Sequence, residues 1–323
     1  MARDRVTAAE RWLGPLLRDA SLVARRLFRA PVFVAVTALT LTLGLGLFAV
    51  VYTVVEKILL EPMPYRDPGD LYYVWRDYGE TLNRRRAPLP GTDVLELQQA
   101  GGVIEDVVAL QAFLGGVFSW NADEDPIEIS TIVTAPGLFE MLGVQPTLGR
   151  VFAPDDAGPD APFTMVLTHE LWNRLGADRE IVGKEVRLNG RPHTVIGVLP
   201  RDFRFVRNDA DGPAQRPDAY SNLRVNLVDP SPNQADYSAL MRARPGTSPD
   251  GVAAVVDAVG RFIEVRNLDG RGLKLYSVGV KTDLVAAVRP AVIALAAAGV
   301  VLALMLTVNL ASMLLARAAQ REH

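Results

Sequence analysis

Cysteine is absent from this chain of 323 residues, and histidine occurs only three times. Without cysteine, neither a disulfide framework nor a thiolate-ligated metal site can form. The absence of cysteine does not indicate the cellular compartment, because an oxidising space permits disulfides without requiring them. His169-Glu170 lacks the second histidine of a helical zinc-protease motif. His193 falls in a predicted hairpin strand, where we expect an ordinary surface or edge position.

Motifs that bind nucleotide phosphates or calcium are also missing. No P-loop pattern occurs in the sequence, so the chain cannot hold a nucleotide through such a loop. Asn121, Asp123 and Asp125 resemble the start of a calcium loop. Pro126 then stands where that loop requires glycine, and Ile132 where it requires glutamate, which excludes the site. We therefore predict a non-catalytic chain with no metal and no cofactor.

Two long uncharged apolar runs are what the sequence does contain, at residues 30–55 and 290–316. A helix of about 20 apolar residues crosses a bilayer, and it satisfies its own backbone groups in lipid. We therefore predict two transmembrane helices. A cleaved signal peptide is the alternative for the first run. That run exceeds the usual apolar core of about 7–15 residues, and residues 54–57 offer no small-x-small cleavage pattern.

Arginines predict how the two runs are oriented. The basic residues expected at the membrane interface are Arg25, Arg26, Arg29, Arg317 and Arg321. Positive charge beside a span favours the cytoplasmic side, so both ends of the chain are predicted to be cytoplasmic. The segment 56–289 is then translocated, and its 33 acidic against 25 basic residues suit that location.

The segment 1–29 places apolar residues such as Trp12, Leu16 and Phe28 among arginines at roughly helical spacing. Such a segment lies in the cytoplasmic headgroup region as an amphipathic helix, with its arginines against anionic lipid. A disordered basic tail is the alternative interpretation of the same residues.

Small residues recur four positions apart in both apolar runs, and small side chains let membrane helices approach closely. The predicted helix-packing residues are Ala38, Thr42, Gly46, Ala294, Ala298 and Asn309. Asn309 is included because its amide is costly to expose to lipid and hydrogen-bonds a neighbouring helix instead. The alternative is that glycine and alanine are simply common in membrane helices.

The segment between the two runs alternates predicted strands with short helices. Strands are expected at 71–75, 107–113, 116–120, 127–133, 164–168, 185–188, 192–199, 237–243 and 273–280. Helices are expected after a cap at Thr92 or Asp93, at 136–142, at 169–175 and from 248 to 263. Asn189-Gly190 is the clearest local signal, because both positions of a tight hairpin turn need positive φ.

This alternation indicates an α+β or α/β domain with split βαβ units. Two charged groups in it are interpreted as solvated turns, namely the pair Asp155-Asp156 and the triplet 84–86.

Several segments, in order along the chain, carry a family resemblance. They are the first apolar run with its exit (27–65), PGLFEMLGVQPTLGRVF (136–152), VLTHELW (166–172), IVGKEVRLNG (181–190), TVIGVLP (194–200) and the second run (289–317). The chain resembles MacB/FtsX-type ABC transporter permeases with a MacB-like periplasmic core domain, and is closest to the acidobacterial-type duplicated permeases.

The resemblance implies an α+β periplasmic domain, built from porter-like βαβ units and an inserted subdomain, between two transmembrane α-helices. The implied segments are a cytoplasmic amphipathic helix (1–29), a first transmembrane helix (30–55), the periplasmic core domain (56–289), a second transmembrane helix (290–316) and a cytoplasmic end (317–323). Members of the family carry further spans, so an N-terminal fragment of a longer permease is expected.

The implied function is a permease subunit in the bacterial cytoplasmic (inner) membrane. It couples ATP hydrolysis by a separate cytoplasmic ABC ATPase to movement of its periplasmic domain, for export or extraction of a substrate. A second permease copy or half and membrane lipid are the other implied partners, and no nucleic acid is expected. A two-span periplasmic receptor is the alternative. Receptors of that kind continue into a signalling module, whereas only six residues follow Arg317.

Overall fold

The computed structural model describes residues 63–78, 86–121, 124–205, 216–225, 227, 237–266 and 274–319, with residues 35, 38–39, 42–44, 46, 48–50 and 52–53 near the start. The chain divides into two compact units. Pro62–Ala287 is called the central unit, and Met1–Glu61 with Val288–His323 is called the terminal unit.

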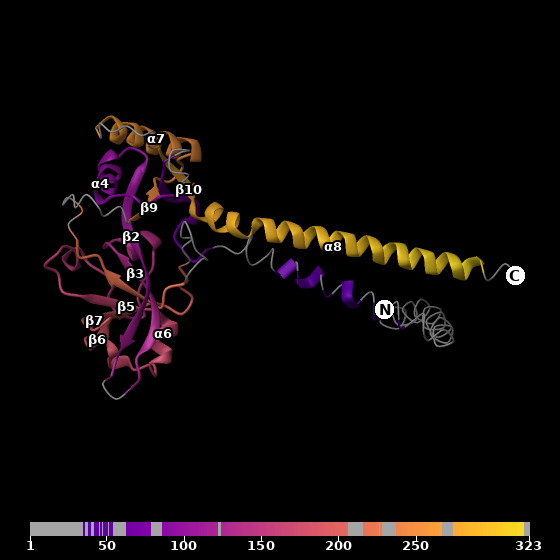
Figure 1. The fold of residues 1–323 in the computed structure, drawn as a ribbon, viewed down its shortest axis with the longest axis horizontal. Helices are drawn as coiled ribbons and strands as arrows, with labels where there is room; N and C mark the ends of the chain where they lie inside the picture. The colour runs from indigo at the N-terminus through magenta and orange to yellow at the C-terminus, as the bar shows by residue number, and fades with distance from the viewer. Residues whose placement is uncertain are drawn as a thin grey trace, which may run out of the picture. The chain divides into compact units, whose positions relative to one another are not determined.

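The central unit contains a mixed α/β arrangement (Figure 1). Its helices are η2 (Pro68–Asp70), α4 (Gly91–Ala100), α5 (Leu138–Leu142), η3 (Pro154–Asp156), α6 (His169–Arg174), η4 (Arg179–Ile181) and α7 (Pro249–Arg266). Its strands are β1 (Leu71–Asp77), β2 (Ile104–Ser119), β3 (Ile127–Thr134), β4 (Leu148–Gly149), β5 (Thr164–Leu167), β6 (Glu185–Leu188), β7 (Arg191–Val198), β8 (Ala219–Asn222), β9 (Ser238–Ala243) and β10 (Lys274–Gly279). Helix α8 (Val280–Ala319) follows β10 directly.

Four of the ten strands form one part of the sheet, in the order β10-β1-β9-β2. β1 is antiparallel to β10 and β9, and β2 is antiparallel to β9. β1 and β2 are therefore parallel with β9 between them, while β9 and β10 are parallel with β1 between them. The connections β1-α4-β2 and β9-α7-β10 thus form two interlocked split βαβ units, which confirms the predicted units.

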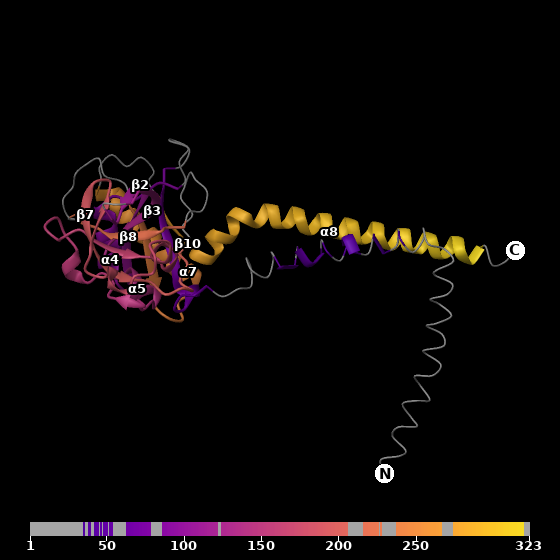
Figure 2. The same ribbon diagram turned by 90° about the horizontal axis from the view of Figure 1, so that it is seen from below.

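Strands β3 to β8 lie in the chain between β2 and β9 and form the inserted part of the sheet. β3 is parallel to β8, β8 is antiparallel to β5, and β5 is parallel to β7. β2 belongs to both parts, because its first half pairs with β9 and its second half with β3 and β6. Figure 2 shows β2, β3 and β8 as neighbours.

Strands β1 and β9, inside the sheet, are buried on both faces. Leu71, Tyr73 and Trp75 of β1 enter an aromatic cluster that also contains Phe139 and Tyr220. The alternate residues of β1 enter a second cluster, which packs beneath α4 and α7. These two helices lie at one end of the central unit (Figure 1). A third cluster fills the inserted part between β5, β7 and α6.

The predicted hairpin is confirmed by β6 and β7, with Asn189 at φ 50° and Gly190 at φ 77°. The two strands predicted at 107–113 and 116–120 are wrong, because they form the single strand β2. Its pairing with β3 shifts register between Phe113 and Gly116, where Gly115 adopts a φ of 60°. Such a bulge bends a strand without ending it.

Several helices and strands begin or end a few residues away from the predicted positions, and two of these differences bear on the site. α4 begins at Gly91 after Pro90 and has no side-chain cap, so the predicted cap at Thr92 or Asp93 is wrong. Asp93 instead points into the core. The strand predicted at 273–280 is shorter, since Val280 already begins α8. Within the described residues, no helix combines the length and apolarity of a membrane span.

His193 is buried rather than at the surface, which corrects the sequence interpretation. Its Nδ1 atom lies 3.0 Å from the Arg191 carbonyl oxygen, and its ring lies 5.0 Å from that of Phe163. Burial lowers the pKa of His193, and the positive charges of Arg191 and Arg224 lower it further, while the Arg191 carbonyl offsets part of the shift. β7 pairs with β5 and β6 on either side, so a residue in β7 is not at an edge.

The lowered pKa predicts how stability changes with pH. As the pH falls below about 6.5, the unfolded chain takes up this proton before the folded one does. The free energy of unfolding therefore falls on acidification, by at most about 1.4 kcal/mol per pH unit from this group. In His193→Phe we expect a flatter dependence between about pH 7 and pH 5. Urea unfolding followed by tryptophan fluorescence measures it, and equal slopes in the two proteins would contradict the prediction.

Candidate functional site

The first turn of α8 is fixed to the sheet by a group of side chains that we call the α8 anchor, comprising Trp75, Arg86, Tyr276 and Asp283. Antiparallel pairing places Trp75 of β1 opposite Tyr276 of β10. Ala87 exchanges two backbone hydrogen bonds with Arg76, of 3.0 and 2.9 Å, which holds Arg86 beside the end of β1. β10 then leads directly into α8, so Asp283 falls in the first helical turn.

Asp283 and Arg86 form an ion pair in the α8 anchor. The Asp283 side chain is 2% exposed and that of Arg86 is 29% exposed, so the aspartate is desolvated while the guanidinium reaches solvent. The Arg86 guanidinium carbon also lies 5.3 Å from the centre of the Trp75 ring. A carboxylate in the first turn is further stabilised by the positive end of the helix dipole.

Tyr276 joins the same group. Burial raises the pKa of Tyr276, and the charge and hydrogen bond of Arg86 offset part of this shift. Tyr276 therefore keeps its proton at neutral pH. Arg86 thus contacts β1, β10 and α8 through three different interactions, and it ties the first turn of the helix to two adjacent strands.

A second buried ion pair lies one residue further along β1. Arg76 Nε donates to Asp93 Oδ2 at 2.6 Å, and Arg76 Nη1 donates to the Tyr78 hydroxyl at 3.1 Å. Asp93 is in the first turn of α4. Burial raises the pKa of Asp93, and the Arg76 charge offsets only part of the increase. Two helices are therefore held at the end of β1 by first-turn aspartates.

The interpretation of the charged triplet 84–86 as a solvated turn is wrong for Arg86, while Arg84 and Arg85 lie outside the described residues. No local pattern signals the Arg86 contact, because its partner lies far away in the chain. Asp93 directly precedes the apolar residues Val94, Leu95 and Leu97, and this pattern suggested only a helix cap.

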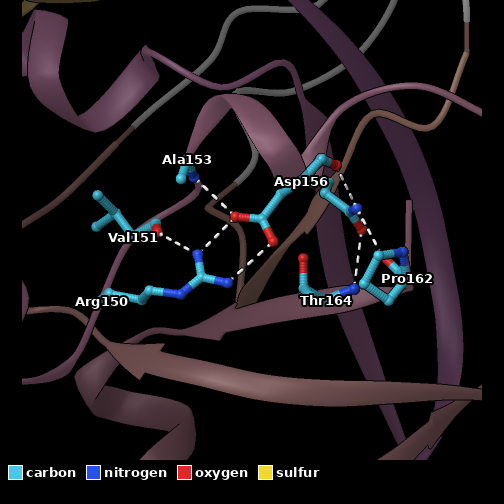
Figure 3. A network of polar contacts seen from close by, with 7 residues as sticks. Arg150, Val151, Ala153, Asp156, Pro162 and Thr164 are labelled. Atoms are coloured by element: carbon cyan, nitrogen blue, oxygen red, sulfur yellow. Dashed lines mark hydrogen bonds and ion pairs between the residues drawn. The ribbon is translucent and has the colours of Figure 1, made fainter. Parts of the chain in front are cut away.

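The interpretation of Asp155-Asp156 as a solvated turn is wrong for Asp156, which is buried in a polar network (Figure 3). Arg150 donates to both of its oxygens, at 2.5 and 3.0 Å, and the Ala153 amide donates at 2.7 Å. Burial alone would raise the pKa of Asp156, but these hydrogen bonds and the Arg150 charge outweigh it and lower the pKa.

Asn222 completes this network from β8. Its side-chain amide donates to the carbonyls of Asp156 and Pro162, and its oxygen accepts from the Thr164 amide at 2.9 Å. Because the carboxylate and the amide are both occupied, the network fixes the connection from β4 to β5 and offers no obvious ligand position.

The predicted helix-packing residues fall on helical backbone. Ala38, Thr42 and Gly46 lie among the described residues near the start, and Ala294, Ala298 and Asn309 lie on α8. The five whose side chains are described, all but Asn309, are exposed within this single chain, so their packing stays a prediction. Of the predicted interface arginines, Arg317 lies on α8, and Arg25, Arg26, Arg29 and Arg321 lie outside the described residues.

In the part of the chain that the structure describes, no cluster of three or more histidine or acidic side chains is placed to hold a metal ion.

Comparison with known proteins identifies a family. The model of the MacB-like periplasmic core domain matches residues 34–259. This match confirms the family resemblance that the sequence motifs indicated. No curated protein matches the chain.

Three solved structures are similar to it. A permease domain from Porphyromonas gingivalis has 17% identity and a TM-score of 0.49, covering 68% of this chain and 94% of that one. The periplasmic region of MacB from Actinobacillus actinomycetemcomitans has 15% identity and a TM-score of 0.47, covering 69% and 94%. The extracellular domain of the noncanonic ABC-type transporter YknZ from Gram-positive bacteria has 16% identity and a TM-score of 0.44, covering 64% and 98%.

The α8 anchor predicts an unequal effect of two similar substitutions. Asp283→Asn removes a buried charge that Arg86 neutralises, so we expect the free energy of unfolding to fall by about 2 kcal/mol. Asp257→Asn is the matched control, because Asp257 pairs with Arg261 on the exposed surface of α7. Its expected loss is below about 0.5 kcal/mol. Urea unfolding of the full chain in detergent measures both, and equal losses would contradict the anchor.

Proposed function

The chain belongs to the MacB-like periplasmic core domain family, and from this membership we propose that it is a permease subunit of an ABC transporter. ATP hydrolysis is assigned to a separate cytoplasmic ATPase. The chain contributes membrane helices and an extracytoplasmic domain that moves a substrate for export or extraction. A second permease copy or half completes the proposed transporter.

The proposed membrane arrangement has transmembrane helices at 30–55 and 290–316, in the bacterial cytoplasmic membrane. Residues 1–29 and 317–323 are cytoplasmic in this arrangement, and residues 56–289 are extracytoplasmic. Two observations support this arrangement. The two uncharged runs have arginines beside them, and the central segment matches a domain family that is periplasmic.

The proposed coupling between the membrane helices and the central unit rests on one observation, the buried first turn of α8. This helix runs without interruption from Val280 to Ala319. Val280 and Asp283 are both 2% exposed, and Asp283 is paired with Arg86. A displacement of α8 therefore acts on β1 and β10 without an intervening flexible loop.

Pro290 lies inside α8, ten residues after its start. Proline removes one helix hydrogen bond and permits a bend at that point. The helix nevertheless continues through Pro290, so in the proposed mechanism motion of its membrane part reaches the first turn, which keeps its contacts with the sheet.

The membrane arrangement is tested with single cysteines, which are unique because the chain has none of its own. Asn189→Cys lies on the exposed β6-β7 turn, and Arg317→Cys lies beyond the second run. In intact spheroplasts we expect a membrane-impermeant maleimide to label the first variant and not the second. Permeabilised cells provide the control, in which both should react. Labelling of Asn189→Cys only after permeabilisation would contradict the arrangement.

The coupling is tested by disulfide crosslinking between cysteines placed in the two runs, at Gly46 and around Ala298. With the cognate ATPase present, we expect ATP to change which pairs crosslink, because the helices carry the motion of the ATPase. ADP and a hydrolysis-deficient ATPase are the controls. Identical crosslinks with and without ATP would contradict a permease, and would favour the two-span receptor.

A further inference from the structure

The segment that leads into β1 is fixed to the inserted part of the central unit before the strand begins. We call residues 63–67 the entry strap. The Tyr65 ring lies 6.2 Å from the ring of Phe203 and 6.3 Å from that of Phe205. The Tyr65 hydroxyl donates to the Arg204 carbonyl oxygen at 2.6 Å. The strap therefore contacts the segment between β7 and β8, far along the chain.

A second set of contacts joins the entry strap to the end of α5. The Arg66 amide donates to the Leu142 carbonyl oxygen at 2.9 Å. Gly143 follows with a φ of 71°, and a Cβ atom on it would lie 2.8 Å from the Arg66 Cβ atom. Carbon atoms in contact stay about 3.5–4.0 Å apart, so this approach requires glycine. α5 also lies between β2 and β9 in the chain, so both partners of the strap belong to the inserted part.

The entry strap covers a buried arginine of β9. Arg242 is 2% exposed. Its guanidinium donates to the Met141 carbonyl oxygen at 2.7 and 3.1 Å, to that of Arg66 at 2.6 Å and to that of Asp67 at 3.3 Å. All three acceptors are main-chain oxygens, and two of them belong to the strap. Arginine stays charged in proteins, so these acceptors are what allow the cation to remain buried.

The strap has little else to hold it. Asp67 has a φ of 39° and a ψ of 66°, in the left-handed region that is costly for residues other than glycine. Such a conformation persists only where surrounding contacts impose it. The side chains of Arg66 and Asp67 are exposed, and the ion pair of Arg66 with Glu105 at 3.0 Å is a surface pair that adds little. A few identifiable contacts therefore decide whether the strap stays in place.

The two membrane connections are thus fixed in different ways. α8 is a continuous helix whose first turn is attached to β1 and β10. The entry strap is short, exposed and strained, and it is attached to α5 and to the segment after β7. The second arrangement can be released without disturbing the pairing of β1.

We propose that the entry strap is a releasable link between the first membrane connection and the inserted part, with Arg242 as its positioning residue. In the closed form, a pull on this connection is shared between β1 and the inserted part. In the open form, β1 alone takes the pull. The role of the strap in transport rests on the permease function proposed above, whereas its release does not.

Hydrogen exchange of the full chain in detergent, followed by mass spectrometry, measures the release. The probe is the Arg66 amide. The reference is the Arg76 amide, which donates to the Ala87 carbonyl oxygen beside β1. After correction for intrinsic rates, we expect Arg66 to exchange faster than Arg76 through a local opening. Equal exchange of the two amides would show that the strap opens only when the central unit unfolds, and would overturn the proposal.

Two arginine variants test the positioning role. Arg242→Met keeps an apolar stem and removes every donor, so we expect the Arg66 amide to exchange at least about tenfold faster relative to Arg76. Arg244→Met is the matched control, because Arg244 is exposed and donates to the Gly102 carbonyl oxygen at 2.8 Å. It should leave the ratio unchanged. If Arg242→Met accelerates both amides equally, Arg242 serves overall stability alone and the proposal fails.

Two glycine variants displace the strap without touching Arg242. Gly143→Ala places a methyl group against the Arg66 Cβ atom, so we expect faster exchange of the Arg66 amide relative to Arg76. Gly176→Ala is the control, because Gly176 has a φ of 87° but open space around its missing Cβ atom. It introduces similar backbone strain away from the strap. Equal changes in the two variants would contradict the proposal.

The role in transport is tested with the cognate ATPase. We expect ATP, but not ADP, to change the exchange of the Arg66 amide while that of Arg76 stays the same. If ATP changes the crosslinks between the two runs and not the Arg66 amide, the strap takes no part in coupling and that part of the proposal fails. If neither responds to ATP, the permease assignment fails, and the exchange measured on the chain alone still decides whether the strap is releasable.

Discussion

The chain enters and leaves the central unit on two adjacent antiparallel strands, and this constraint governs the rest of the structure. Tyr72, near the start of β1, pairs with Gly279, at the end of β10. The connection that precedes β1 and the helix that follows β10 therefore emerge at the same end of one strand pair. Both connections lead toward the predicted membrane spans, so a force on either is applied to the same two strands.

β1 is suited to receive such a force because it is buried on both faces and paired on both sides. Its last residues position two helices through first-turn aspartates, Asp93 directly and Asp283 by way of Arg86. A buried ion pair adds little net stability over apolar packing, since desolvation offsets much of the attraction. Removing one partner is nevertheless costly, so these pairs specify the position of each helix more than they raise overall stability.

The sequence predicted those features that depend on neighbouring residues. The Asn189-Gly190 turn, the alternation of β1 and most of the strands and helices follow from local pattern, whereas β4 and β8 were not predicted. The burial of Asp156, His193 and Asp283 did not, because it depends in each case at least partly on a segment that the fold brings in from elsewhere. Asn222, for example, reaches Asp156 across 66 residues of chain.

Strand pairing connects the inserted part of the sheet with the α8 anchor. Tyr220 belongs to β8, which pairs with β3, and the pairing continues through β2 and β9 to β1 and β10. Contiguity alone does not transmit a signal, because transmission needs an element with two discrete arrangements. β1 and β9 are buried on both faces and paired on both sides, so this part of the sheet resists internal deformation. The first turn of α8 is therefore attached to the most rigid part of the sheet, since the α8 anchor joins it to β1 and β10.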